Sequence, residues 1–148
     1  MDKQEWTAEQ QVWQRVRANR EEPPQNDLRQ LRAEAMELAA VYRGLAAQLS
    51  GDLRDLVKTL YRGEKANASA LAGIGVLSRQ GGENLKLWQP EKGAPAKQLE
   101  RCYHRSRRCV TEYLARSAEG EFGIVFEKMA KREQEHCCLI AQLLGELK

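Results

Sequence analysis

Apolar residues recur along most of the chain at alternating spacings of three and four. This spacing is typical of α-helices that bury one face. Four such series are present, over residues 28–49, 53–74, 99–117 and 122–147. The pattern therefore predicts an all-α fold with four long amphipathic helices.

The expected helix boundaries carry the residues that start and stop helices. Asp27 is a predicted N-cap, with Gln30 placed to complete a capping box. Ser50–Asp52 ends the first helix and begins the second, and a connection this short forces the two helices to be antiparallel. Pro95 opens the third helix, and Gly120 separates the third from the fourth.

The connection lengths predict the topology of the bundle. Short turns near residues 51 and 119 make two antiparallel hairpins, whereas residues 79–96 form a link rich in glycine and proline. An extended link of this size spans roughly 55–60 Å. A helix of about 24 residues is roughly 36 Å long, so the link can run the length of the bundle. We therefore expect the second and third helices to be parallel.

Residues 1–22 are predicted to form a short amphipathic helix outside the bundle, which occupies residues 27–148. Thr7 is its expected cap, and Trp6, Trp13 and Val16 fall near one face. We expect this arm to pack on the bundle or on a second copy of the chain.

Composition narrows the class of protein. The 148 residues fit one domain, and 42% apolar with 30% charged residues is typical of a soluble globular protein. Strong helix formers dominate, which disfavours a β-sandwich or a parallel α/β sheet. No apolar run approaches the roughly 20 residues of a membrane span, and we see no signal peptide. The four cysteines form no C-x-x-C pair, so we expect a cytoplasmic protein with reduced thiols.

Two pairs of polar residues interrupt the apolar faces of the second and fourth helices. Glu64 and Asn67 occupy consecutive core positions of one, and Glu133 and His136 do the same in the other. Residues three apart share a helix face, so both pairs should point into the bundle. A buried, unpaired carboxylate costs several kcal/mol. A metal cation is one group that would compensate this cost.

The two halves of the chain also match at an offset of 69 residues. The matched pairs are Leu60 with Met129, Glu64 with Glu133, Asn67 with His136, and Leu71 with Ile140. Tyr42 and Tyr113 precede the two polar pairs at similar distances. We interpret this as an internal repeat of a helical hairpin.

With these motifs, residues 27–147 resemble the ferritin-like superfamily, and within it the rubrerythrin-related proteins. The resemblance rests on Glu133–His136, on Glu64–Asn67, and on Glu34–Glu37 ahead of Tyr42. In that family four helices supply carboxylates and Glu-x-x-His pairs that hold two metal ions. The resemblance implies that six residues are candidate metal ligands: Glu34, Glu37, Glu64, Asn67, Glu133 and His136. The full set in the family has six ligands, and this chain offers about four. Glu34 and Glu37 remain alternatives for one position.

The same resemblance implies iron as the metal, with another divalent metal or none as alternatives. It also implies a homodimer, and a function in iron handling or oxidative-stress defence, through a ferroxidase or a peroxide-reducing activity. Tyr42 and Tyr113 would then be redox-active or hydrogen-bonding partners of the site.

The chain departs from the family pattern in three places. Asn67 stands where the family has histidine, and Arg105 and Ser106 stand where the third helix should offer a carboxylate. The rubredoxin-like module with paired C-x-x-C motifs is absent from this sequence. We therefore expect a partly degenerate site with one tightly bound ion or two loosely bound ions.

Two other hypotheses remain open. Arg105 or Arg108 could pair with Glu64 or Glu133, which would leave a non-catalytic bundle acting as a structural or protein-interaction module. Residues 97–116 carry a local charge of +4, from six basic and two acidic residues, which offers a surface for nucleic acid. Because the whole chain has a net charge of only +3, we regard nucleic-acid binding as the least favoured of the three.

Overall fold

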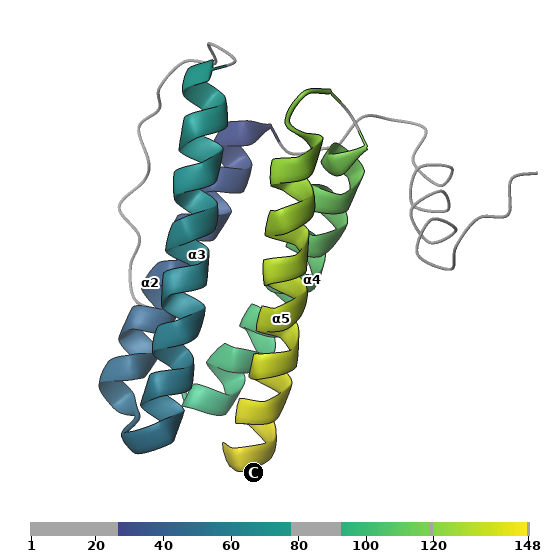
Figure 1. Ribbon diagram of the computed structural model, residues 1–148. Helices are drawn as coiled ribbons and strands as arrows, with labels where there is room; N and C mark the ends of the chain where they lie inside the picture. Colours follow the sequence, from purple (N-terminus) through teal and green to yellow (C-terminus); the bar gives the residue numbers. More distant parts are fainter. Residues whose placement is uncertain (1–26, 78–92, 119, 148) are drawn as a thin grey trace, which may run out of the picture.

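The computed structural model describes residues 27–77, 93–118 and 120–147, which form a bundle of four α-helices (Figure 1). The helices are α2 (Leu28–Gln48), α3 (Gly51–Leu77), α4 (Pro95–Ser117) and α5 (Gly123–Leu147). The predicted all-helical class is confirmed for this part of the chain. The predicted helix over residues 1–22 and nearly all of the predicted link lie outside the described residues.

The predicted helix boundaries are also present. Asp27 Oδ1 accepts a hydrogen bond from the Gln30 backbone N–H at 2.9 Å, and Gln30 Oε1 accepts one from the Asp27 N–H at 2.8 Å. This reciprocal pair is the capping box that starts α2. α4 begins at Pro95, as expected. Gly51 has a φ of +62°, a left-handed conformation that lets the chain reverse between α2 and α3.

The helices pair as two hairpins. α2 packs along α3, and α4 packs along α5; between the hairpins, α3 meets α5 and α2 meets α4. In Figure 1, α2 and α5 run downward while α3 and α4 run upward. α3 and α4 are therefore parallel, which agrees with the direction expected from the length of the link between them.

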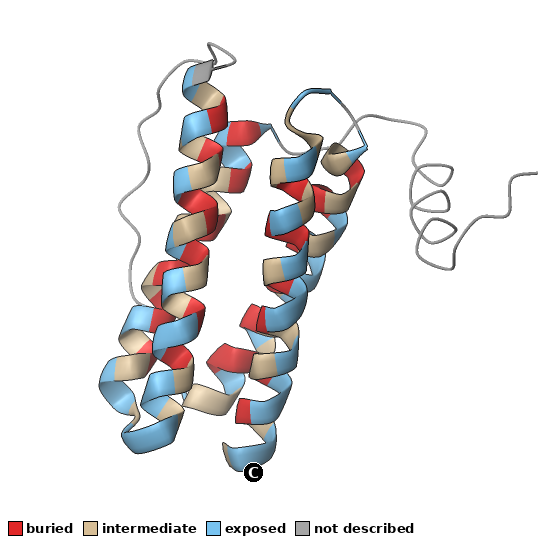
Figure 2. Ribbon diagram, viewed as in Figure 1, coloured by how far each residue is buried: buried red, intermediate tan, exposed pale blue. Residues whose placement is uncertain are grey.

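The core follows the predicted helix faces. Buried residues turn toward the space between the helices, and exposed residues cover the outside (Figure 2). Each fully buried leucine side chain contributes about 1.5–3 kcal/mol. Predicted core positions near the helix ends are only half-buried, because packing neighbours are fewer there: Leu49, Leu53, Ser117, Phe122 and Leu147.

The cysteines divide between the core and the surface. Cys102 and Cys109 are buried on α4, where they fill the core as small apolar residues, as predicted. Cys137 is half-buried and Cys138 is exposed. None of the four is in a disulfide. No helix in the described ranges is long and apolar enough to cross a bilayer.

Candidate metal centre

Three side chains with metal-binding atoms converge at the centre of the bundle. Glu64 comes from α3, and Glu133 and His136 come from adjacent turns of α5. One donor atom from each lies within 4.8 Å of the others. All three residues are at most 2% exposed, so the group lies in the core. The structure thus brings together three of the six residues that the sequence analysis proposed as ligands.

The histidine ring is oriented by the two carboxylates. His136 Nδ1 lies 3.0 Å from Glu64 Oε1 and 3.6 Å from Glu133 Oε2. The edge that carries Nδ1 therefore faces the carboxyl groups. The opposite edge, with Nε2, faces the backbone of α3 at Gly63.

Gly63 makes room for this ring. A Cβ atom at position 63 would lie 2.1 Å from His136 Nε2 and 2.5 Å from its Cε1, which is too close for any side chain. From sequence we expected Gly63 to permit close packing of another backbone or to mark a bend. The structure shows instead that it accommodates the imidazole of the candidate site.

Asn67 is buried beside the group, and its side chain bridges Glu133 and Arg132. Its Nδ2 donates a hydrogen bond to Glu133 Oε1 at 2.9 Å, and its Oδ1 accepts one from Arg132 Nη1 at 2.6 Å. The amide oxygen, which is the atom that would bind a metal, thus faces Arg132. Asn67 is placed to orient Glu133 rather than to donate its own oxygen to the site.

The two buried carboxyl groups differ in protonation. Burial, reinforced by the neighbouring Glu133, raises the pKa of Glu64 well above its usual value. Burial also acts to raise the pKa of Glu133, but the interactions with Glu64 and His136 outweigh it, and the pKa lies below its usual value. In the metal-free protein, Glu64 therefore holds a proton more strongly than Glu133 does.

Several buried oxygen atoms around the group have no hydrogen-bond partner among the described residues. Two of them are carboxylate oxygens of the group itself, Glu64 Oε2 and Glu133 Oε2. Buried polar atoms are nearly always paired, so these two oxygens are available to bind a cation. Two carboxylates and one imidazole are a donor set that fits a divalent metal ion.

Tyr42 and Tyr113 are fully buried, one from each hairpin. Burial raises the pKa of both hydroxyls well above the usual value; Cys102 and Glu64 add to this effect at Tyr42, and Cys109 and Glu133 add to it at Tyr113. Both tyrosines are therefore neutral and able to donate a hydrogen bond. Their electrostatic coupling to the carboxyl groups agrees with the expected position near the site.

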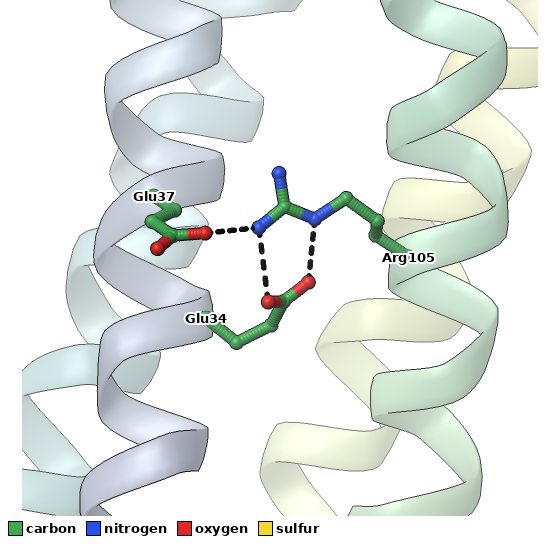
Figure 3. Close-up of polar contacts among 3 residues, drawn as sticks. All are labelled: Glu34, Glu37 and Arg105. Carbon is green, nitrogen blue, oxygen red and sulfur yellow. Dashed lines mark hydrogen bonds and ion pairs between the residues drawn. The ribbon is translucent and has the colours of Figure 1, made fainter. Parts of the chain in front are cut away.

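Glu34 and Glu37, the other two expected ligands, are held by Arg105 from α4 (Figure 3). Arg105 Nε lies 2.6 Å from Glu34 Oε1, and its Nη2 lies 2.9 Å from Glu34 Oε2 and 2.6 Å from Glu37 Oε2. We had considered Glu64 and Glu133 as partners of Arg105; these hydrogen bonds join it to Glu34 and Glu37 on α2 instead. Arg108, the alternative, is exposed on α4.

The basic residues of α4 form an exposed face away from this centre. Arg101, His104, Arg107 and Arg108 are exposed. Arg107 also stacks over the ring of Tyr103, at 5.9 Å from its centroid. Because Arg105 is bound to two carboxylates, the positive charge of this face is smaller than the sequence suggests.

The internal repeat is visible in the contacts. Glu64 and Glu133 are equivalent positions, as are Asn67 and His136, and each Glu contacts the Asn or His of the other hairpin. The same offset of 69 residues pairs Gly63 with Arg132. Sequence reasoning missed Arg132, although it directly precedes Glu133, as Gly63 directly precedes Glu64.

Comparisons with known proteins identify no relative. No family model and no curated protein matches the sequence, and no solved structure matches the chain.

Proposed function

We propose that the centre of the bundle binds a divalent transition-metal ion, iron, through Glu64, Glu133 and His136. The observation that carries the proposal is the convergence of these three donors in the core. The unpaired oxygens around them support it, because a cation would satisfy atoms that are otherwise buried without a partner.

The mixed donor set favours iron or manganese over the alternatives. Carboxylates suit hard cations such as Mn²⁺, imidazole suits iron, and a Glu/Glu/His set falls between these preferences. No cysteine belongs to the group among the residues that the structure describes, which disfavours a soft-metal site. Bound iron would supply redox chemistry toward oxygen or peroxide.

The surrounding residues would hold the ligands in place. Asn67 fixes one oxygen of Glu133, and Gly63 leaves space for the ring of His136. Tyr42 and Tyr113 present neutral hydroxyls that can donate a hydrogen bond within the core. Residues that orient ligands in this way commonly change metal affinity by about 10- to 100-fold when they are replaced.

We also propose that the fold is ferritin-like and the protein rubrerythrin-related, acting in iron handling or oxidant defence. The parallel direction of α3 and α4 and the repeated Glu-x-x-(Asn/His) pair support this relationship. A homodimer that uses the Trp6 and Trp13 arm belongs to the same proposal, and its test is the mass of the full chain by light scattering. A monomer would contradict it.

A second candidate function is a structural or protein-interaction module without chemistry. The Arg105 ion pairs favour it, because they engage two of the six expected ligands in a contact that needs no metal. The two candidates differ in one measurable property, which is whether the chain retains metal.

The test is metal content after anaerobic loading with ferrous iron and removal of excess metal. We expect wild-type protein to retain iron and Glu133→Ala/His136→Ala to lose it. Glu135→Ala is the matched control, because Glu135 is exposed on the same helix between the two ligands. Circular dichroism of each variant confirms that the helices are intact.

Wild-type protein without bound iron, or a double variant that retains it as well as wild type, would contradict the proposal. If iron is retained, the consumption of oxygen and of hydrogen peroxide by the loaded protein then distinguishes storage or transfer from catalysis.

A further inference from the structure

Two arginines lie where the internal repeat would otherwise supply further metal ligands: one occupies such a position, and the other bonds to the residue at such a position. Arg105 is equivalent to Glu34 when the hairpins are aligned on Tyr42 and Tyr113. Arg132 is bonded to Asn67, the equivalent of His136. We infer that the centre holds a single metal ion, with the guanidinium groups of Arg105 and Arg132 supplying the positive charge of a second. This inference rests on the proposed function.

Arg105 makes a bidentate ion pair, which is a strong contact. Its guanidinium binds both oxygens of Glu34 in a parallel fork and bridges to Glu37 (Figure 3). Such a fork is the strongest geometry for an arginine and a carboxylate. The Arg105 side chain is 14% exposed, whereas those of Glu34 and Glu37 are 29% and 41% exposed, so the contact lies at the edge of the core. A metal ion would have to displace a fixed cation in order to recruit Glu34.

The second arginine, Arg132, contacts Asn67 at the position where the other half of the repeat has the imidazole of His136. The residues at these positions differ in size. At one pair of equivalent positions, Gly63 leaves room for the large ring of His136. At the other pair, the long Arg132 side chain reaches the smaller Asn67 and bonds to its oxygen. The two contacts are complementary: a small residue faces the imidazole, and a large cationic residue faces the amide. A histidine at position 67 would compete with Arg132 for space.

The first test uses wild-type protein saturated with Mn²⁺. We expect one ion per chain by elemental analysis, and an electron paramagnetic resonance spectrum of isolated Mn²⁺. Two ions per chain with a magnetically coupled spectrum would overturn the inference while leaving the proposed metal function intact. No bound ion, with Mn²⁺ or with Fe²⁺, would overturn both.

The second test restores the ligands that the repeat lacks. Arg105→Glu, Asn67→His and Arg132→Gly are combined, so that the positions equivalent to Glu34, His136 and Gly63 carry the same residues in both hairpins. We expect two ions per chain and a coupled Mn²⁺ spectrum. Arg107→Glu is the control, because it makes the same charge change at an exposed position of α4, and it should still bind one ion. A folded triple variant that holds only one ion would contradict the inference.

A single substitution keeps the inference testable if the triple variant fails to fold. Arg105→Met removes the cation and preserves most of the side-chain volume, which releases Glu34 and Glu37. We expect calorimetry to show a second Mn²⁺ binding event that is weaker than the first. It should be at least about tenfold tighter than any second event in wild type. Arg108→Met is its matched control. Identical titrations of Arg105→Met and wild type would overturn the assignment of Arg105.

Discussion

The two hairpins of the bundle are related by the internal repeat, and residues at equivalent positions of the repeat can be compared directly. The second helices, α3 and α5, carry Glu64 and Glu133 at equivalent sites, and both are fully buried. The first helices, α2 and α4, carry Glu34 and Arg105 at equivalent sites, and both are partly exposed. The glutamate is retained in the core, where the two carboxyl groups meet one histidine, and charge is reversed where the helices meet closer to solvent.

The differences come as complementary pairs rather than as single changes. Glu34 and Arg105 bond to each other, and the change from Gly63 to Arg132 accompanies the change from His136 to Asn67. Equivalent positions in a repeat face each other across the bundle, so a change on one hairpin alters the surroundings of the other. Both paired changes add a cation and remove a metal-binding group from the repeated set.

We expect the largest effect, on metal affinity, from a substitution in the core next to His136. Gly63→Ala places a methyl group where the edge of His136 now lies, and the ring must move. We expect metal affinity to fall by about 10- to 100-fold, as for other changes that misorient a ligand. The measurement is an Fe²⁺ or Mn²⁺ titration under anaerobic conditions.

The control for this change is Gly73→Ala on the same helix. Gly73 is exposed, and a Cβ atom there would meet nothing within 4 Å. We expect its metal affinity to be unchanged and its stability to rise by up to about 1 kcal/mol, because alanine is the better helix former. An equal loss of affinity in both variants would mean that the position of the His136 ring does not matter.

The next effect concerns two equivalent residues whose pKa values move in opposite directions. The raised pKa of Glu64 contributes stability at low pH that is lost as pH rises through the folded-state pKa. The lowered pKa of Glu133 contributes stability that is present above its unfolded pKa and lost only as pH falls. The metal-free protein should therefore become less stable as pH rises from weakly acidic to weakly basic.

Glu64→Gln tests this assignment, because glutamine cannot ionise. We expect the urea midpoint of the metal-free variant to decline less with rising pH than that of metal-free wild type. Glu135→Gln, at an exposed position of α5, should leave the slope unchanged. The same slope in Glu64→Gln and wild type would show that another group titrates.

The smallest effect lies at the start of the first helix of each hairpin. α2 begins with a capping box on Asp27, whereas α4 begins at Ala94 and Pro95 without a side-chain cap. We expect Asp27→Ala to lower the unfolding free energy by about 1 kcal/mol and Ala94→Ser to raise it by about 0.5–1 kcal/mol. Urea denaturation measures both changes. Equal stability of Ala94→Ser and wild type would mean that α4 gains nothing from a cap.

Helix periodicity, capping residues and the repeat were sufficient to predict the four helices, their order and most of their buried faces. These features are local: each depends on residues within a few turns of one another. The same local reasoning identified Glu64, Glu133 and His136, because polar residues on an apolar face stand out against the pattern. It did not identify the partner of Arg105, since that contact joins residues 71 positions apart.

Other contacts needed the packed structure for the same reason. The space that Gly63 leaves for His136 and the bond from Arg132 to Asn67 depend on how closely α3 and α5 approach. The sequence by itself determined which residues enter the core and which helix carries them. Only the tertiary structure decided which of them meet, because the spacing and rotation of packed helices bring specific atoms within bonding distance, and an ion pair forms between whichever opposite charges that packing places together.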